Sequence, residues 1–172
     1  MKREMCRVQP REGRPRPQNG TARFPVGPSP VYGGPMSNVG LPPDLDAFLN
    51  RPNPAVIGCI RPDGFPMTVA TWYEWQDGLA LVNMEDSRSR LRWMRQDPKV
   101  SLTVFDKSWY RHVSLRGVVV RIVDDSDLGD IDRLARRYNG HPYRNRTARR
   151  VSAWIEPRGW HGWDSADEAW RT

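Results

Sequence analysis

The sequence predicts one mostly β domain of about six antiparallel strands with short helices between them. Short apolar runs rich in β-branched and aromatic residues recur along the chain. Turn dipeptides such as Asp63-Gly64 and Asp77-Gly78 separate several of these runs, and Gly there can take the positive φ that a chain reversal requires. We expect such a sheet to close into a small barrel, because closure removes exposed sheet edges.

The most informative stretch is Asn53–Met84, which contains three apolar runs. The turn Arg61–Gly64 separates the first two runs, and Gln76–Gly78 separates the last two. This pattern predicts a three-stranded antiparallel meander. Its middle strand is expected to run from Pro66 to Trp75.

Three segments show helical rather than alternating periodicity. The first is Pro42–Asn50, whose apolar face consists of Leu45, Phe48 and Leu49. The second is Ser87–Gln96, with Leu91 and Met94 on its apolar side and Asp86 or Ser87 as its expected N-cap. The third lies within Asp124–Asn139, and Gly140 is expected to end it.

Three further strands follow the meander along the chain. Lys99–Phe105 alternates apolar and polar residues, and Arg111–Val123 reads as a long strand with a bulge at Gly117. Arg149–Glu156 is the last predicted strand, and Gly159–Trp163 is expected to continue it after a break at Pro157.

The net charge of +7 belongs mostly to the N-terminal segment. Residues 1–35 contain seven basic and two acidic residues, whereas the rest contains 20 basic and 18 acidic residues. We therefore expect residues 1–40 to form a disordered Pro/Gly/Arg-rich extension, residues 41–163 the folded domain and residues 164–172 a polar tail. An alternative is that translation starts at Met36, just before the ordered part of the sequence. Nucleic-acid binding through the extension ranks last, since the folded part is nearly balanced in charge.

Several other classes of protein are disfavoured. Cys6 lies in a polar segment and Cys59 in an apolar strand, which is typical of a reduced cytoplasmic protein rather than a disulfide framework. The three histidines, His112, His141 and His161, have no metal-ligand spacing. No apolar run approaches the roughly twenty residues of a membrane span, so no membrane association is expected. No nucleophile–base arrangement or glycine-rich phosphate loop stands out.

A series of motifs nevertheless occurs in an informative order. They are Leu41–Leu49, Arg61–Pro66, Thr68–Trp75, Ser87–Arg92 ending at Asp97-Pro98, Tyr110–Gly117, Ile131–Tyr138 and Arg158–Trp163. Together they resemble the pyridoxamine 5'-phosphate oxidase-like split β-barrel superfamily, and within it the branch of F420-dependent oxidoreductases.

The resemblance implies a homodimer with cofactor sites at the subunit interface. The middle strand of the meander would run beside a flavin or deazaflavin ring, and the start of the second helix would hold a phosphate. The cofactor-binding residues implied in this way are Met67, Thr68, Ala70, Thr71, Trp72, Asn83, Arg88 and Arg90. A helix start with two arginines suits a phosphate, because it combines free amides with charged hydrogen bonds.

Other aromatic residues are weaker candidates for a substrate pocket. They are Trp109, Tyr110, Trp160 and Trp163. His161 is a candidate proton donor, because the pKa of an unperturbed histidine lies near neutrality. The favoured interpretation of His161 is a structural interface residue. Trp93 stands where the family often has a polar residue.

The function implied by the resemblance is that of an oxidoreductase. Reduced F420 would transfer a hydride to a flat or conjugated small molecule, and the cofactor would supply the hard chemistry. The alternatives are an FMN-dependent enzyme like pyridoxamine-phosphate oxidase, or a split barrel that binds flavin or haem without turnover. The expected partners are a second copy of the chain and a small-molecule substrate.

Overall fold

A computed structural model describes residues 40–164. The predicted N-terminal extension, apart from Gly40, and the predicted C-terminal tail, apart from Asp164, lie outside the described residues. The helices are α1 (Pro43–Leu49), α2 (Ser89–Gln96) and α3 (Gly129–Asn139). The strands are β1 (Ala55–Ile60), β2 (Pro66–Thr71), β3 (Tyr73–Gln76), β4 (Leu79–Glu85), β5 (Lys99–Phe105), β6 (His112–Asp124) and β7 (Arg150–Trp163).

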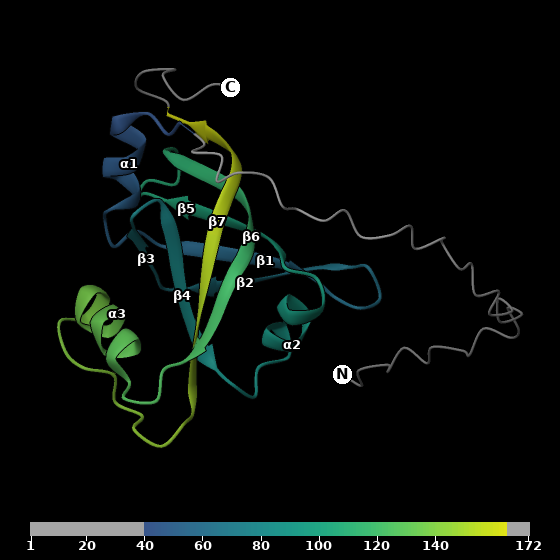
Figure 1. Cartoon of the computed structure of the whole chain (residues 1–172). Helices are drawn as coiled ribbons and strands as arrows, with labels where there is room; N and C mark the ends of the chain where they lie inside the picture. The colour runs from purple at the N-terminus through teal and green to yellow at the C-terminus, as the bar shows by residue number, and fades with distance from the viewer. Residues whose placement is uncertain (1–39, 165–172) are drawn as a thin grey trace, which may run out of the picture. The chain divides into compact units, whose positions relative to one another are not determined.

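The strands form one seven-stranded sheet in the order β2-β1-β5-β6-β7-β4-β3. Every neighbouring pair is antiparallel. The long strand β6 pairs with β5 on one side and with β7 on the other. Figure 1 shows β1 and β5 running across β4 and β7, so the sheet is strongly curled. The predicted mostly β, antiparallel fold is confirmed, and the sheet has the open form of a split barrel rather than a closed ring.

The predicted meander is wrong in one respect, because its middle strand is divided at Trp72. Residues before Trp72 form β2, which pairs with β1, and residues after it form β3, which pairs with β4. These two strands are the opposite edges of the sheet. The chain therefore passes from one edge to the other across one residue. This division explains why the sheet has seven strands rather than about six.

Two buried clusters hold the domain together. The larger one fills the inside of the curled sheet and includes Leu45, Phe48 and Leu49 of α1, as their helical spacing predicted. Cys59 is also buried there, as expected for a small core residue. The smaller cluster joins Leu128, Ile131 and Leu134 to partly buried aromatic residues, Trp72 among them. Removing these apolar side chains from water is the main force that docks α3 on the sheet.

The start of α2 differs from the prediction, whereas α3 lies within its predicted segment. Arg88 is the N-cap of α2 and makes no capping hydrogen bond with its side chain, so neither Asp86 nor Ser87 caps the helix. α3 begins at Gly129, and the Asp125 carboxylate accepts hydrogen bonds from the amides of Asp130 and Ile131 in its first turn. This carboxylate satisfies amides that the first turn of a helix leaves free.

The predicted bulge at Gly117 is confirmed by a register shift in the pairing of β6 with β7. A Cβ atom at Gly117 would lie 2.6 Å from the Glu156 carbonyl oxygen, so only glycine permits this close approach. Pro157 lies opposite Gly117, and β7 continues through it without the predicted break. Gly140 ends α3 at a φ of 79°, as predicted. Within residues 40–164, none of the helices has the length and apolar character that crossing a membrane requires.

Candidate functional site

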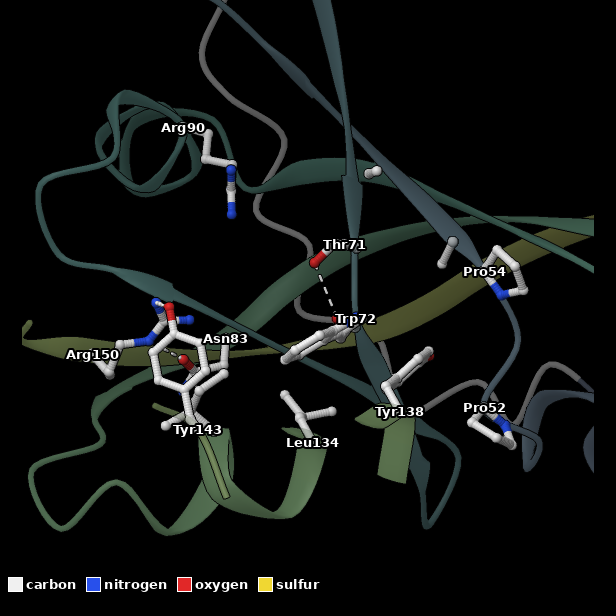
Figure 2. A pocket seen from close by; sticks show the side chains of 13 residues that line it. Pro52, Pro54, Thr71, Trp72, Asn83, Arg90, Leu134, Tyr138, Tyr143 and Arg150 are labelled. Atoms are coloured by element: carbon white, nitrogen blue, oxygen red, sulfur yellow. Dashed lines mark hydrogen bonds between the residues drawn. The ribbon is translucent and has the colours of Figure 1, made fainter. Parts of the chain in front are cut away.

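A pocket of about 520 Å³ lies where the two edge strands meet α3 (Figure 2). Its walls come from the segment before β1, the β2–β3 junction, β4, the start of α2, α3, the loop after α3 and the start of β7. The lining residues are Pro52, Pro54, Ala55, Ala70, Thr71, Trp72, Asn83, Arg90, Ile131, Leu134, Tyr138, Tyr143 and Arg150. A volume of this size is typical of pockets for small molecules and cofactors.

Stacked aromatic rings form one wall of the pocket. The rings of Trp72 and Tyr138 lie 5.5 Å apart between centroids, with 12° between their planes. The Tyr138 hydroxyl donates to the Asn53 carbonyl at 2.9 Å and accepts from the Tyr73 amide at 3.4 Å. Burial raises the pKa of Tyr138 to about 12, so its hydroxyl stays protonated near neutral pH. Tyr138 is therefore a structural donor and offers a fixed flat surface.

Arg90 projects from the first turn of α2 toward the side of the pocket that carries Arg150 and Tyr143 (Figure 2). Its Nε is buried and has no hydrogen-bond partner within the described residues. Burial lowers the pKa of Arg90, and the nearby charge of Arg88 adds a smaller effect in the same direction. A half-buried guanidinium with an unpaired donor is costly unless an anion meets it.

Arg150, the first residue of β7, lies in the same pocket and is only 8% exposed. Its Nε donates to Asn83 Oδ1 at 2.8 Å, and its guanidinium lies 4.8 Å from the centroid of the Tyr143 ring. Its Nη1 is 3.9 Å from a Glu85 carboxylate oxygen, at the far limit of an ion pair. Burial lowers the pKa of Arg150.

Asn83 connects this arginine to the rest of the fold. Its Nδ2 donates to Asp125 Oδ2 at 2.9 Å and to Ser152 Oγ at 3.0 Å. Ser152 in turn donates to Asp130 Oδ2 at 2.6 Å. The network therefore joins β4 and β7 to the start of α3. The Asn83 side chain makes hydrogen bonds to three protein side chains. We therefore expect Asn83 to orient Arg150 rather than to bind a ligand directly.

The charge of the pocket has one sign. Among the described residues that line it, the charged ones are Arg90 and Arg150, and there is no aspartate, glutamate or histidine. Two guanidinium groups suit a phosphate or carboxylate, and the aromatic wall suits a flat ring. No group of three or more His, Cys, Asp or Glu residues within positions 40–164 could hold a metal ion. The arrangement is that of a binding pocket for a flat, anionic molecule.

The structure brings several of the cofactor-binding residues suggested by the resemblance into this pocket. The lining includes Ala70, Thr71, Trp72, Asn83 and Arg90. Met67 and Thr68 lie farther along β2, outside the lining residues. β2 has only one neighbour in the sheet, so main-chain groups on its outer edge remain open to a ligand. Arg88 also lies outside the pocket and pairs with Glu85 at 3.2 Å.

The weaker substrate candidates are not brought into the pocket of a single chain. Trp109 and Tyr110 are 70% and 69% exposed, in the connection between β5 and β6. Trp160, His161 and Trp163 lie toward the end of β7, whereas Arg150 begins that strand. None of these residues lines the pocket of the single chain.

Arg150, Tyr138 and Tyr143 line the pocket but were not predicted from the sequence as site residues. The sequence pattern around Arg150 could have indicated it. Polar Arg150 and Ser152 alternate with apolar Val151 and Ala153 along one strand. An arginine on one face of a strand that is buried on both faces indicates a partner or a ligand. For Tyr138, the helical spacing predicted only a position on the core face of α3. Its place beside Trp72 depends on tertiary packing, which the spacing does not show.

The fold and the pocket together define a split-barrel protein with a basic, aromatic pocket at the sheet edges. The sequence matches the family model described as pyridoxamine 5'-phosphate oxidase over residues 41–164, and the chain belongs to that family. None of the curated proteins matches the sequence.

Solved structures agree with this assignment. A structure named F420 reductase is 27% identical, with a TM-score of 0.64, and the match covers 70% of this chain and 98% of that one. A conserved hypothetical protein from Mycobacterium tuberculosis is 26% identical, with a TM-score of 0.58 and coverage of 76% and 89%. A pyridoxamine 5'-phosphate oxidase-related, FMN-binding protein from Nostoc punctiforme shares the fold, at 10% identity, a TM-score of 0.52 and coverage of 72% and 85%.

Proposed function

We propose that this protein is an oxidoreductase that uses reduced F420 to transfer a hydride to a flat or conjugated small molecule. The observation that carries the proposal is Arg90, whose buried Nε has no partner among the described residues and which lines a pocket beside stacked aromatic rings. The 27% identity to a structure named F420 reductase supports F420 as the leading cofactor.

The residues of the pocket fit a phosphate-bearing, flat cofactor. Arg90 would hold the phosphate with charge-assisted hydrogen bonds. Trp72 would lie against the ring system, and the open edge of β2 would offer main-chain donors and acceptors to the polar rim of the ring. Reduced F420, when bound, supplies the hydride. The chain binds, orients and shields the reactants from water.

The proton that accompanies the hydride is expected to come from water. No acidic residue or histidine is found among the described residues that line the pocket. Burial raises the pKa of Tyr138 to about 12, and its hydroxyl already donates a hydrogen bond to the Asn53 carbonyl. A substrate whose hydride acceptor is an electrophilic carbon therefore suits this pocket better than one that needs a strong general acid.

FMN is the second candidate cofactor. Two arginines at one end of the pocket favour a dianion, and a phosphate monoester carries a charge of about −1.5 to −2 at neutral pH. In that case the protein would be an FMN-dependent enzyme or a non-catalytic flavin carrier.

We also propose that the site is completed in a homodimer. The candidate substrate residues Trp109, Tyr110, Trp160 and Trp163 lie outside the pocket of their own chain. A partner copy could bring them to it. A cytoplasmic location remains an expectation from the sequence.

The test is a titration of the purified protein with F420 and with FMN, followed by turnover. The reduced cofactor that binds is mixed with protein and a panel of conjugated, electrophilic compounds, and its oxidation is followed by absorbance. We expect F420 to bind, and its reduced form to be oxidised only when protein and a substrate are both present. Binding of FMN alone would select the second candidate, and binding of neither cofactor would reject both.

A further inference from the structure

We propose that Arg150 is a second anion-binding residue of the pocket and holds the cofactor phosphate together with Arg90. The assignment rests on the proposed function for the identity of the anion. The two side chains come from β7 and from α2, so the phosphate would bridge the sheet and a helix. Figure 2 shows Arg90 directed toward the side of the pocket where Arg150 lies.

The hydrogen bonds of Arg150 leave part of its guanidinium open. Nε donates to Asn83, and Nη1 is 3.5 Å from the Tyr143 hydroxyl. None of the hydrogen bonds or ion pairs found among residues 40–164 involves Nη2. Arginine binds phosphate through adjacent N–H groups in a fixed fork. The Nη2 group of Arg150 is available for such a contact.

The charge of Arg150 is only partly balanced by protein. Within the described residues, the Glu85 carboxylate lies 3.9 Å from Arg150 but closer to Arg88, at 3.2 Å. The Asp125 carboxylate also stabilises the charge of Arg150, but Asn83 lies between the two side chains. A buried charge without a close partner is unfavourable. Arg90 adds a second positive charge to the same pocket, and the two arginines repel one another. An anion between them would relieve both costs.

The surroundings of Arg150 also fix its orientation. Asn83 holds Nε, and Asp125 and Ser152 hold the Asn83 amide from the other side. The Tyr143 ring covers one face of the guanidinium. A guanidinium that is already oriented loses little conformational freedom when a ligand binds.

The experiment compares Arg150→Gln with Arg149→Gln in titrations with F420 and FMN, with circular dichroism and thermal melts alongside. Arg149 is the matched control, since it is adjacent, 76% exposed at its side chain and outside this pocket. We expect Arg150→Gln to bind about ten- to a hundredfold more weakly, the usual effect of losing a charged hydrogen bond. Arg149→Gln should bind within about twofold of the parent. A folded Arg150→Gln with parental affinity would overturn the assignment and leave the proposed function intact.

A second variant decides the matter if Arg150→Gln does not fold. Glu85→Gln removes the carboxylate nearest to Arg150 and should strengthen cofactor binding about two- to fivefold. Glu85 also pairs with Arg88 and acts on the charge of Arg90, so the gain should persist when Arg88→Gln or Arg90→Gln is added. Unchanged or weaker binding in Glu85→Gln, or loss of the gain in either double variant, would contradict the role of Arg150.

A third arm separates this inference from the proposed function. If the parent binds neither cofactor, calorimetry with inorganic phosphate is performed on the parent and on Arg150→Gln. Phosphate binding by the parent that is lost in the variant would keep Arg150 as an anion site while the proposed function fails. Absence of phosphate binding by the parent would overturn both.

Discussion

Trp72 stacks on Tyr138 with 5.5 Å between the ring centroids and 12° between the ring planes. Trp72 is the single residue between the two edge strands of the sheet, and Tyr138 lies near the end of α3. The contact therefore fixes the helix against the point where the sheet edges meet. The same two rings form a wall of the pocket, so stability and ligand binding should both depend on them.

Replacement of Trp72 by alanine should reduce both properties. Trp→Ala in a core costs about 3–5 kcal/mol, and Trp72 is only partly buried, so we expect a loss of about 2 kcal/mol in the free energy of unfolding. Cofactor binding should weaken as well, because a face of the ring site is removed. Urea unfolding and cofactor titration measure the two effects, with Trp72→Phe as the control that keeps a ring. Lower stability with unchanged affinity would show that Trp72 does not contact the cofactor.

Alkaline pH should destabilise the fold through Tyr138. Folding raises the pKa of Tyr138 from 10.0 to about 12, because burial disfavours the phenolate. The folded protein thus keeps the proton in the interval where the unfolded chain loses it. The stabilisation is fully present below a pH of about 10 and is lost as the pH rises through about 12. Urea unfolding at several pH values across this interval measures the loss.

Tyr138→Phe is the control for this dependence. The variant should lose about 1 kcal/mol at neutral pH, the usual net value of the hydrogen bond to Asn53. Its stability should fall less steeply than that of the parent between pH 10 and 12. Burial raises the pKa of Tyr73 as well, so Tyr73 adds to the decline from a pH of about 10 upward and should keep part of it in the variant. Equal slopes for parent and variant would assign the dependence to other groups.

The local parts of the fold could be predicted from the sequence. The strand Lys99–Phe105 has the same bounds in the prediction and in the structure, because Val100, Leu102 and Val104 alternate strictly with polar residues. The apolar face of α1 was predicted for the same kind of reason. Both patterns depend only on which face of one element is buried.

The parts that depend on tertiary pairing could not be predicted in this way. The run from Pro66 to Gln76 continues to alternate through Trp72, so nothing local marks the change of partner strand. The exact start of α3 depends on Asp125, whose carboxylate accepts hydrogen bonds from two helix amides and from the Asn83 side-chain amide. The basic pocket likewise combines Arg90 and Arg150, which are sixty residues apart in the sequence.

The exposed aromatic residues predict that two chains associate. Trp109 and Tyr110 are 70% and 69% exposed in the connection before β6, and large aromatic residues are enriched at interfaces. Sedimentation at micromolar concentration should give twice the chain mass of 19.9 kDa. The variant Trp109→Asp should shift the protein toward the monomer. Phe65→Asp is the control, since Phe65 is 69% exposed at a different turn. A monomeric parent would contradict the proposed dimer.

Three residues at the start of α2 allow the phosphate site to be tested against the fold. Arg90 lines the pocket, Leu91 is 0% exposed in the core, and Arg88 pairs with Glu85 outside the pocket. The resemblance implied that both arginines hold the phosphate, whereas the geometry favours Arg90. The three alanine variants should therefore behave differently, although the three positions lie within four residues at one helix start.

Arg90→Ala should weaken cofactor binding about ten- to a hundredfold, because a charged hydrogen bond contributes about 1.5–3 kcal/mol. It should leave the melting temperature nearly unchanged or slightly raised, since its buried Nε has no partner in the described protein. Leu91→Ala should do the opposite, with a loss of about 2–5 kcal/mol in stability from the core cavity and little change in affinity while the protein remains folded. Arg88→Ala should change affinity by less than about threefold, the range of an exposed ion pair.

Titrations with F420 and FMN and thermal melts on all three variants measure these differences. Equal losses of affinity in the two arginine variants would mean that Arg88 turns into the pocket when the cofactor binds, and parental affinity in both would place the phosphate elsewhere.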